Sequence, residues 1–130
     1  PVQWGKNYPP EELVEGDIRN GNQYVGVADE RIVATFFYCP MEDPDYQVIE
    51  GAWLNEEPYG VVHRITSDGT VKGAASACLT WAFGQCGNLK IDTYRDNVVM
   101  QNMLKKNGFQ SCGIIHVQDG SERLAYQKTK

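Results

Sequence analysis

The stretch GTVKGAASACLTW, at residues 69–81, has the composition of an anion-binding loop. A strand that ends at about Ser67 and leads through this loop into a helix would gather unpaired backbone N–H groups at the positive end of a helix dipole. Gly73 and the small residues that follow it would let a phosphate approach those N–H groups closely. The pattern matches neither the P-loop nor the dinucleotide-binding glycine motif. These residues alone therefore leave two readings open, a phosphate-binding loop and a plain turn that begins a helix.

The elements that must position this loop are indicated by the spacing of apolar residues in the first half of the chain. Prolines at the start, acids in the first turn and a closing glycine predict a helix at residues 9–21. Two runs of β-forming residues around an Asp-Glu turn predict a hairpin, at residues 24–28 and 31–39. Residues 46–54 are expected to form an irregular strand, and the alternation at residues 59–67 predicts a regular one.

The second half of the chain alternates helices and strands. A helix is predicted from about residue 73 to residue 85, and its expected buried stripe consists of Ala74, Cys78, Trp81 and Ala82. A strand at residues 88–94 leads to a second helix, with Asp96 as the expected N-cap and Gly108 at the C-cap. The apolar stripe expected for that helix consists of Val99, Met103 and Leu104. Two strands around an Asp-Gly turn, SCGIIHVQ and ERLAYQK, complete a mixed sheet with packed helices, of α/β or α+β class.

Length and composition limit the class of protein. A chain of 130 residues with 42% hydrophobic and 22% charged residues is typical of one globular domain. A net charge of -5 without any basic run argues against a nucleic-acid partner. Four widely spaced cysteines and two histidines form no zinc-type cluster, so we expect no metal and the free thiols of a cytoplasmic protein.

Features of the chain ends and of hydropathy add two expectations. No signal peptide and no apolar run of roughly 18 residues is present, so we expect no membrane partner. The sequence begins at Pro1 without a methionine, within a stretch that contains Trp and Tyr, and we therefore expect that an upstream segment is missing.

Three segments together resemble the GNAT-type N-acetyltransferases, a superfamily that depends on acetyl-CoA. IDTYRDNVVMQNMLKKNGF is similar to the stretch that leads from that family's fifth strand into the next helix. HRITSDGTVKGAASACLTWAF looks like its acetyl-CoA loop and helix, and CGIIHVQDGSERLAYQK looks like its last two strands. The resemblance implies one acetyltransferase-like domain over residues 1–130, without the family's N-terminal strand and helix. It also implies a mostly antiparallel sheet that splays between its fourth and fifth strands, at residues 59–67 and 89–93.

The resemblance places the coenzyme site on the loop described first. The family's loop carries Gln or Arg, two further residues, a Gly, one more residue, and then a Gly or Ala. On this chain the pattern spans residues 70–75, where Gly73 and Ala75 fit and Thr70 stands in place of the Gln or Arg. Lys72 is expected to supply the missing positive charge. The residues that we expect to contact the coenzyme are Ile65, Thr66, Ser67, Val71, Lys72, Gly73, Ala74, Ala75, Ser76 and Asn97.

The catalytic acid that is common in the family has no counterpart here. Its tyrosine lies near the helix-ending Lys, where this chain has Met103 and Leu104. A leaving thiolate still benefits from a nearby phenol, so Tyr94 and Tyr126 are candidates for the acid. Either tyrosine is equally able to serve as an amphipathic packing residue.

Direct transfer to an amine also needs a group that accepts a proton. Glu50, His63 and Asp92 lie on predicted strands beside the expected gap, and histidine has the natural pKa for this task. A structural role is the alternative for each of them, and Asn97 is also explained as a polar residue at a helix start.

These observations predict an N-acetyltransferase that moves an acetyl group from acetyl-CoA to the amine of a small-molecule or amino-acid-like acceptor, by direct attack in a ternary complex. The missing tyrosine and the missing Gln or Arg keep an alternative open, a non-catalytic module that binds acyl-CoA. A homodimer is compatible with either interpretation.

Overall fold

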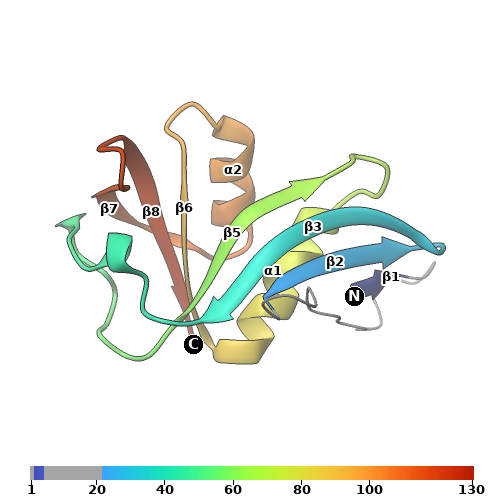
Figure 1. The fold of residues 1–130 in the computed structure, drawn as a ribbon, viewed down its shortest axis with the longest axis horizontal. Coiled ribbons are helices and arrows are strands. Elements are labelled where there is room, and N and C mark those ends of the chain that lie inside the picture. Colours follow the sequence, from blue (N-terminus) through green and yellow to red (C-terminus); the bar gives the residue numbers. More distant parts are fainter. Residues whose placement is uncertain (1, 5–21) are drawn as a thin grey trace. The chain divides into compact units, whose positions relative to one another are not determined.

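A computed structural model describes residues 2–4 and 22–130 of the chain (Figure 1). The predicted helix at residues 9–21 lies outside the described residues. The described part divides into two compact units. Unit 1 comprises the described residues up to 39 together with residues 62–85, and unit 2 comprises residues 40–61 and 86–130. The expectation of a single acetyltransferase-like domain stays a prediction.

Unit 1 contains the predicted hairpin. Strands β2 (Gln23–Ala28) and β3 (Arg31–Pro40) pair in antiparallel register, and β1 (Val2–Trp4) pairs with β2 in parallel. Asp29 and Glu30 form the turn with positive φ angles of 50° and 63°. Two central residues with positive φ are what a type I′ turn requires, and this turn matches the twist of the strands on either side. The prediction of the hairpin is confirmed.

Helix α1 (Ala74–Cys86) packs on this hairpin through one aromatic side chain. The ring centroid of Trp81 lies 5.0 Å from that of Tyr24 on β2 and 5.6 Å from that of Tyr38 on β3. The buried residues of α1 are Ala74, Cys78, Leu79 and Ala82. Most of the predicted stripe is therefore confirmed, with Leu79 as an addition, and Trp81 lies at its partly exposed border.

Unit 2 is built on β6 (Asn88–Thr93), β8 (Glu122–Thr129) and β7 (Gln110–His116), which pair antiparallel in that order. The first two residues of β5 (Gly60–Ser67) pair with β6 in parallel, as Gly60↔Leu89 and Val61↔Lys90. Strand β6 continues to Thr93, beyond this short pairing. The splay between these two strands stays a prediction.

Helix α2 (Val98–Lys106) differs from its prediction in its first turn. Asn97, not Asp96, is the N-cap, because its side-chain oxygen accepts a hydrogen bond from Met100 N at 3.0 Å. Val99 is 81% exposed and not part of an apolar stripe, whereas Leu104 is fully buried. The helix ends at Lys106, and Asn107, not the predicted Gly108, is its C-cap. Gly108 follows with a φ of 88°.

The predicted irregular strand at residues 46–54 is largely wrong. A short 3-10 helix (Pro44–Tyr46) and a two-residue strand β4 (Glu50–Gly51) replace it. Polar contacts outside any strand ladder hold this segment, since Trp53 Nε1 donates to Tyr46 O at 2.9 Å. Strand β4 pairs with β7 as the outermost strand of unit 2.

Two further properties of the described residues bear on function. None of the helices there is both long and apolar enough to cross a membrane. Four cysteines carry free thiols, of which Cys78 and Cys112 are buried and Cys39 and Cys86 partly exposed. Burial raises the pKa of the Cys78 thiol to about 12.

Candidate functional site

The loop between β5 and α1 in unit 1 has the geometry of a helix N-terminus open to an anion. Gly73 has a φ of 79°, a conformation that residues with a side chain rarely adopt. The first helical hydrogen bond runs from Ala77 N to Gly73 O, at 2.9 Å. Gly73 and Lys72 are exposed, while Ala74 turns into the core. The backbone N–H groups of the first turn thus lie beside small side chains, as close approach of a phosphate requires.

A tight turn fixes the start of this loop. Asp68 accepts hydrogen bonds from the hydroxyl of Thr70 at 2.6 Å and from its backbone N–H at 2.9 Å. These two bonds, the hydroxyl first, hold the pKa of the Asp68 carboxyl below its usual value. Gly69, with a φ of 81°, allows the chain to reverse between them.

Arg31 brings a positive charge to the same loop. Its Nη2 donates to Thr70 Oγ1 at 2.6 Å, and its Nε lies 4.0 Å from Asp68 Oδ2. The guanidinium therefore lies beside residue 70, where the family pattern has Gln or Arg and this chain has Thr. The sequence analysis missed Arg31 because it lies 39 residues away and meets the loop only after the hairpin has formed.

The remaining residues predicted to contact the coenzyme are placed as follows. Ile65, Thr66 and Ser67 form the end of β5, and the Thr66 hydroxyl lies 3.0 Å from that of Thr35. Val71, Ala75 and Ser76 are partly exposed residues of the loop and of the first turn of α1. Asn97 lies in unit 2 and is the N-cap of α2, which is the structural role that the sequence analysis gave as its alternative. Contact with the coenzyme stays a prediction for all of them.

A polar network surrounds the end of β6 in unit 2. Arg123 Nη2 donates to Tyr94 Oη at 3.0 Å, and the guanidinium carbon lies 3.9 Å from the centre of the Tyr94 ring. Arg123 Nε is 4.0 Å from Asp92 Oδ1, and Tyr46 donates to Asp92 Oδ2 at 2.6 Å. Burial, together with the charge of Asp92, raises the pKa of Tyr46 well above its usual value, so Tyr46 stays a neutral donor.

The four predicted catalytic side chains have different surroundings. Tyr94 is 60% exposed, whereas Tyr126 is buried and its pKa is raised by that burial. His63 lies in unit 1, where its ring centroid is 5.8 Å from that of Phe37. Glu50 lies on β4 and forms an ion pair with His116. Within unit 2, Tyr94 contacts Arg123 whereas Glu50 contacts His116, so the structure does not join these two candidates through a shared polar partner.

Lys90 is a charged residue in the core of unit 2. It is 4% exposed, and its Nζ lies 3.8 Å from the ring centroid of Tyr59 and 4.2 Å from that of Trp53. Cation–π attraction of this kind stabilises a desolvated ammonium by about 2 kcal/mol. Burial nevertheless lowers the pKa of Lys90. Trp53 and Tyr59 therefore enclose a cation of the chain itself.

Comparison with solved structures shows the family. A GNAT-family acetyltransferase from Streptococcus agalactiae is 34% identical to this chain, with a TM-score of 0.79, over 87% of this chain and 68% of its own. The chain belongs to the GNAT family of acetyltransferases. A GNAT-family acetyltransferase from Bacillus cereus, 19% identical, has the same fold with a TM-score of 0.64 over 87% of this chain and 73% of its own.

A third structure of similar fold is the NatC complex bound to Gag peptide and CoA, which is 13% identical over 83% of this chain and 70% of its own, with a TM-score of 0.59. No protein-family model matches the sequence, and no curated protein does. The suspected GNAT resemblance, the predicted fold class and the predicted enzyme class, an N-acetyltransferase, are confirmed.

Proposed function

We propose that the protein transfers the acetyl group of acetyl-CoA to the amine of a small-molecule or amino-acid-like acceptor. The observation that carries this proposal is the loop at the start of α1, where Gly73, the small residues after it and the helix N-terminus form a cradle for a pyrophosphate. Membership of the GNAT family supports acyl transfer. The CoA bound to the NatC complex, which shares the fold, supports the choice of donor.

Arg31 and Lys72 complete the proposed coenzyme loop. A pyrophosphate carries charge that backbone N–H groups alone neutralise only in part, and a guanidinium adds charge-assisted hydrogen bonds. Arg31 Nη2 already lies 2.6 Å from Thr70 Oγ1. The side chain therefore loses little further conformational entropy when the coenzyme binds.

The reaction requires one bond to form, one to break and two proton transfers. The neutral amine attacks the thioester carbon, the C–N bond forms, and the C–S bond then breaks with the electron pair leaving on sulfur. The thiolate takes up a proton, for which we propose Tyr94 as the donor, because Arg123 occupies the oxygen of this exposed phenol and leaves its O–H to point elsewhere. His63 is the proposed acceptor of the amine proton, with Glu50 and Asp92 as the alternatives. Tyr126 is the alternative to Tyr94 as the proton donor.

One observation favours a second function, the binding of acyl-CoA without chemistry. Leu104, at the place where the family often has its acid, is fully buried, and neighbouring Met103 is also apolar. A chain that kept the loop and lost the acid would bind the coenzyme and leave the thioester intact.

Two measurements separate these functions. Calorimetric titration with acetyl-CoA tests the loop, with Arg31→Ala expected to weaken binding about tenfold and Arg64→Ala, another exposed arginine of unit 1, as the matched control. Turnover is then followed over a panel of amines by loss of thioester absorbance, because the chain's own free thiols would react in an assay for released thiol.

The outcomes are distinct. Binding with turnover supports the enzyme, and binding without turnover on any amine supports the non-catalytic module. Absence of binding at millimolar acetyl-CoA would contradict both.

A further inference from the structure

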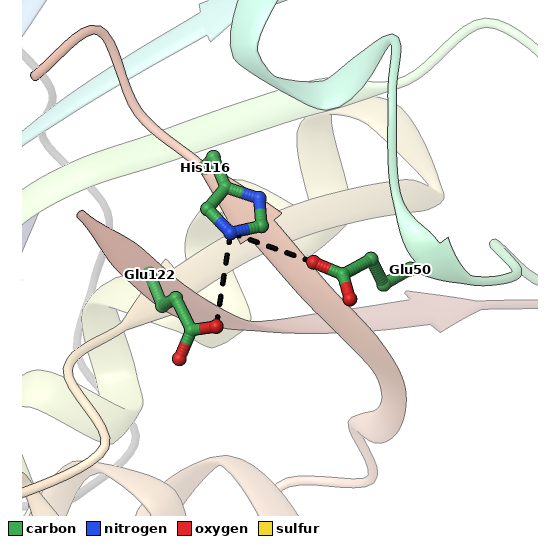
Figure 2. A group of neighbouring side chains, drawn as sticks. All are labelled: Glu50, His116 and Glu122. Atoms are coloured by element: carbon green, nitrogen blue, oxygen red, sulfur yellow. Dashed lines mark ion pairs between the residues drawn. The ribbon is translucent and has the colours of Figure 1, made fainter. Parts of the chain in front are cut away.

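Three side chains of types that can bind a metal ion converge on an exposed face of unit 2, and they are distant in sequence from the coenzyme loop. Figure 2 shows Glu50 from β4, His116 from β7 and Glu122 from β8 turned toward one another. His116 Nε2 lies 3.4 Å from Glu50 Oε2 and 3.7 Å from Glu122 Oε2. One ligand atom from each residue lies within 4.8 Å of both others.

The register of three strands produces this convergence. His116 and Glu122 are direct partners across the β7–β8 pair, so their side chains leave the same face of the sheet. Glu50 pairs with Ile114, which lies two residues before His116 on β7 and hence on that same face. The backbone of the sheet, and not a chance approach of long side chains, therefore brings the three residues together.

Close contact between β4 and β7 fixes the position of Glu50. A side chain at Gly51 would place its Cβ 2.2 Å from Cys112 O, and one at Gly113 would place its Cβ 2.1 Å from Glu50 O. Glycine at both positions allows the two strands to approach this closely, and it holds the Glu50 backbone against β7.

The two spacings from His116 to the carboxylates match those of a tetrahedral transition-metal site. Bonds of roughly 2.1 Å from zinc to nitrogen and oxygen place neighbouring ligand atoms about 3.4 Å apart. The two measured separations from His116 Nε2, 3.4 Å and 3.7 Å, are close to this value. One imidazole and two carboxylates also form a ligand set that first-row divalent ions accept. Glu122 additionally pairs with Arg95 through its other oxygen, Oε1, at 3.4 Å, which leaves Oε2 for the ion.

We propose that Glu50, His116 and Glu122 bind a divalent transition-metal ion of the zinc type, with the fourth coordination position left to water. Calcium and magnesium do not suit the site, because they prefer six or more oxygen ligands. None of the three residues belongs to the coenzyme loop, although Glu50 is also an alternative proton acceptor in the proposed transfer. Metal binding is therefore measured directly and not through activity.

The test is a calorimetric titration of the chelator-treated chain with Zn²⁺, repeated with Co²⁺ while its visible absorption is recorded. We expect one ion per chain, an absorption typical of four-coordinate Co²⁺, and no response to Mg²⁺. His116→Ala should lower the affinity by more than about 100-fold, because loss of a direct ligand costs more than the roughly 10- to 100-fold loss from outer-shell changes. Glu50→Gln and Glu122→Gln should each weaken binding.

Matched variants separate this site from other sources of binding. Glu56→Gln removes an exposed carboxylate of unit 2 that lies outside the cluster, and Cys39→Ser with Cys86→Ser removes the partly exposed thiols. Both should bind Zn²⁺ like the wild type. Circular dichroism confirms that each variant is folded. The proposal is overturned if the wild type binds no Zn²⁺, if His116→Ala binds as tightly as the wild type, or if the serine variant loses binding.

Discussion

The hydroxyl of Tyr94 has one of its two hydrogen-bonding roles already filled. Arg123 donates to the phenol oxygen, so the O–H is left to donate. We predict that Tyr94→Phe lowers kcat for acetyl transfer by about 100-fold, the lower end of what a general acid contributes, with KM for acetyl-CoA changed less than about twofold. Steady-state kinetics with the best amine of the panel measures both constants.

The control for this prediction uses two neighbouring arginines. Arg123→Gln should also lower kcat, because it frees the Tyr94 hydroxyl from its fixed orientation. Arg95→Gln removes an equal charge from an exposed residue that pairs with Glu122, and it should have little effect on kcat. A Tyr94→Phe enzyme with wild-type kcat would remove Tyr94 from the mechanism.

Lys90 makes the free energy of unfolding of the protein vary with pH in the alkaline range. Its pKa in the folded chain is lowered from 10.5 by burial, so folding releases protons from this group. The contribution of Lys90 to the free energy of unfolding is therefore smallest at a pH where Lys90 is charged in both the folded and the unfolded chain. This contribution grows as the pH rises through the folded-state pKa toward 10.5.

This pH dependence is tested by comparing the wild type with a variant that lacks the buried amine. The free energy of unfolding of the wild type, minus that of Lys90→Met, should increase as the alkaline pH rises toward the usual lysine pKa. Denaturant unfolding across this range measures it, and Lys105→Met, an exposed lysine of α2, is the control with no such trend. A difference that does not vary with pH would show that Lys90 keeps its ordinary pKa.

At the scale of elements, local pattern predicted those strands whose neighbours lie close in sequence. The hairpin of β2 and β3 and the strands β7 and β8 follow from alternation and short turns. The segment at residues 46–54 could not be predicted in the same way, because its apolar residues do not share one face. Tyr46 is buried and donates to Asp92, whereas Val48 is 80% exposed. A hydrogen bond to a residue 46 positions away has no signature in the local sequence.

The contact of β4 with β7 gives a prediction for the glycines of these elements. Gly51→Ala should lower the free energy of unfolding by about 1–3 kcal/mol, because its φ of 129° and the 2.2 Å approach of Cys112 O both disfavour a side chain. Gly84→Ala is the counterpart, since Gly84 lies in α1 with nothing within 4 Å of an added Cβ. That change should stabilise the protein by about 0.5–1 kcal/mol. Thermal unfolding measures both, and equal effects of the same sign would contradict the argument.

At the scale of the whole molecule, the sequence predicted only those site residues that lie next to one another along the chain. The coenzyme loop is one stretch of chain, and its glycines and small residues are visible in the sequence. Arg31 meets that loop through the hairpin. His116 faces Glu122 only because the connecting loop spans residues 117–121. A two-residue turn at Asp119 and Gly120 would instead pair His116 with Arg123, so the register needed the structure.

Binding of acetyl-CoA should stabilise the whole chain. A ligand present at about 100 times its Kd adds about 2.7 kcal/mol to the free energy of unfolding, which corresponds to a rise in Tm of about 10 °C for a chain of this size. Differential scanning calorimetry measures the shift. Gly73→Trp should remove most of it, because the indole would occupy the space in front of the loop. An unchanged shift in that variant would place the coenzyme elsewhere.

The burial of Cys78 limits the reaction of this thiol with the proposed product, coenzyme A. Every turnover would release coenzyme A, a small thiol that forms mixed disulfides by exchange once either partner is oxidised. Such exchange needs a thiolate, and a thiol with a pKa of about 12 supplies almost none at neutral pH. The core of unit 1 is thereby protected from the enzyme's own product, and any coenzyme adduct should form on the partly exposed Cys39 and Cys86.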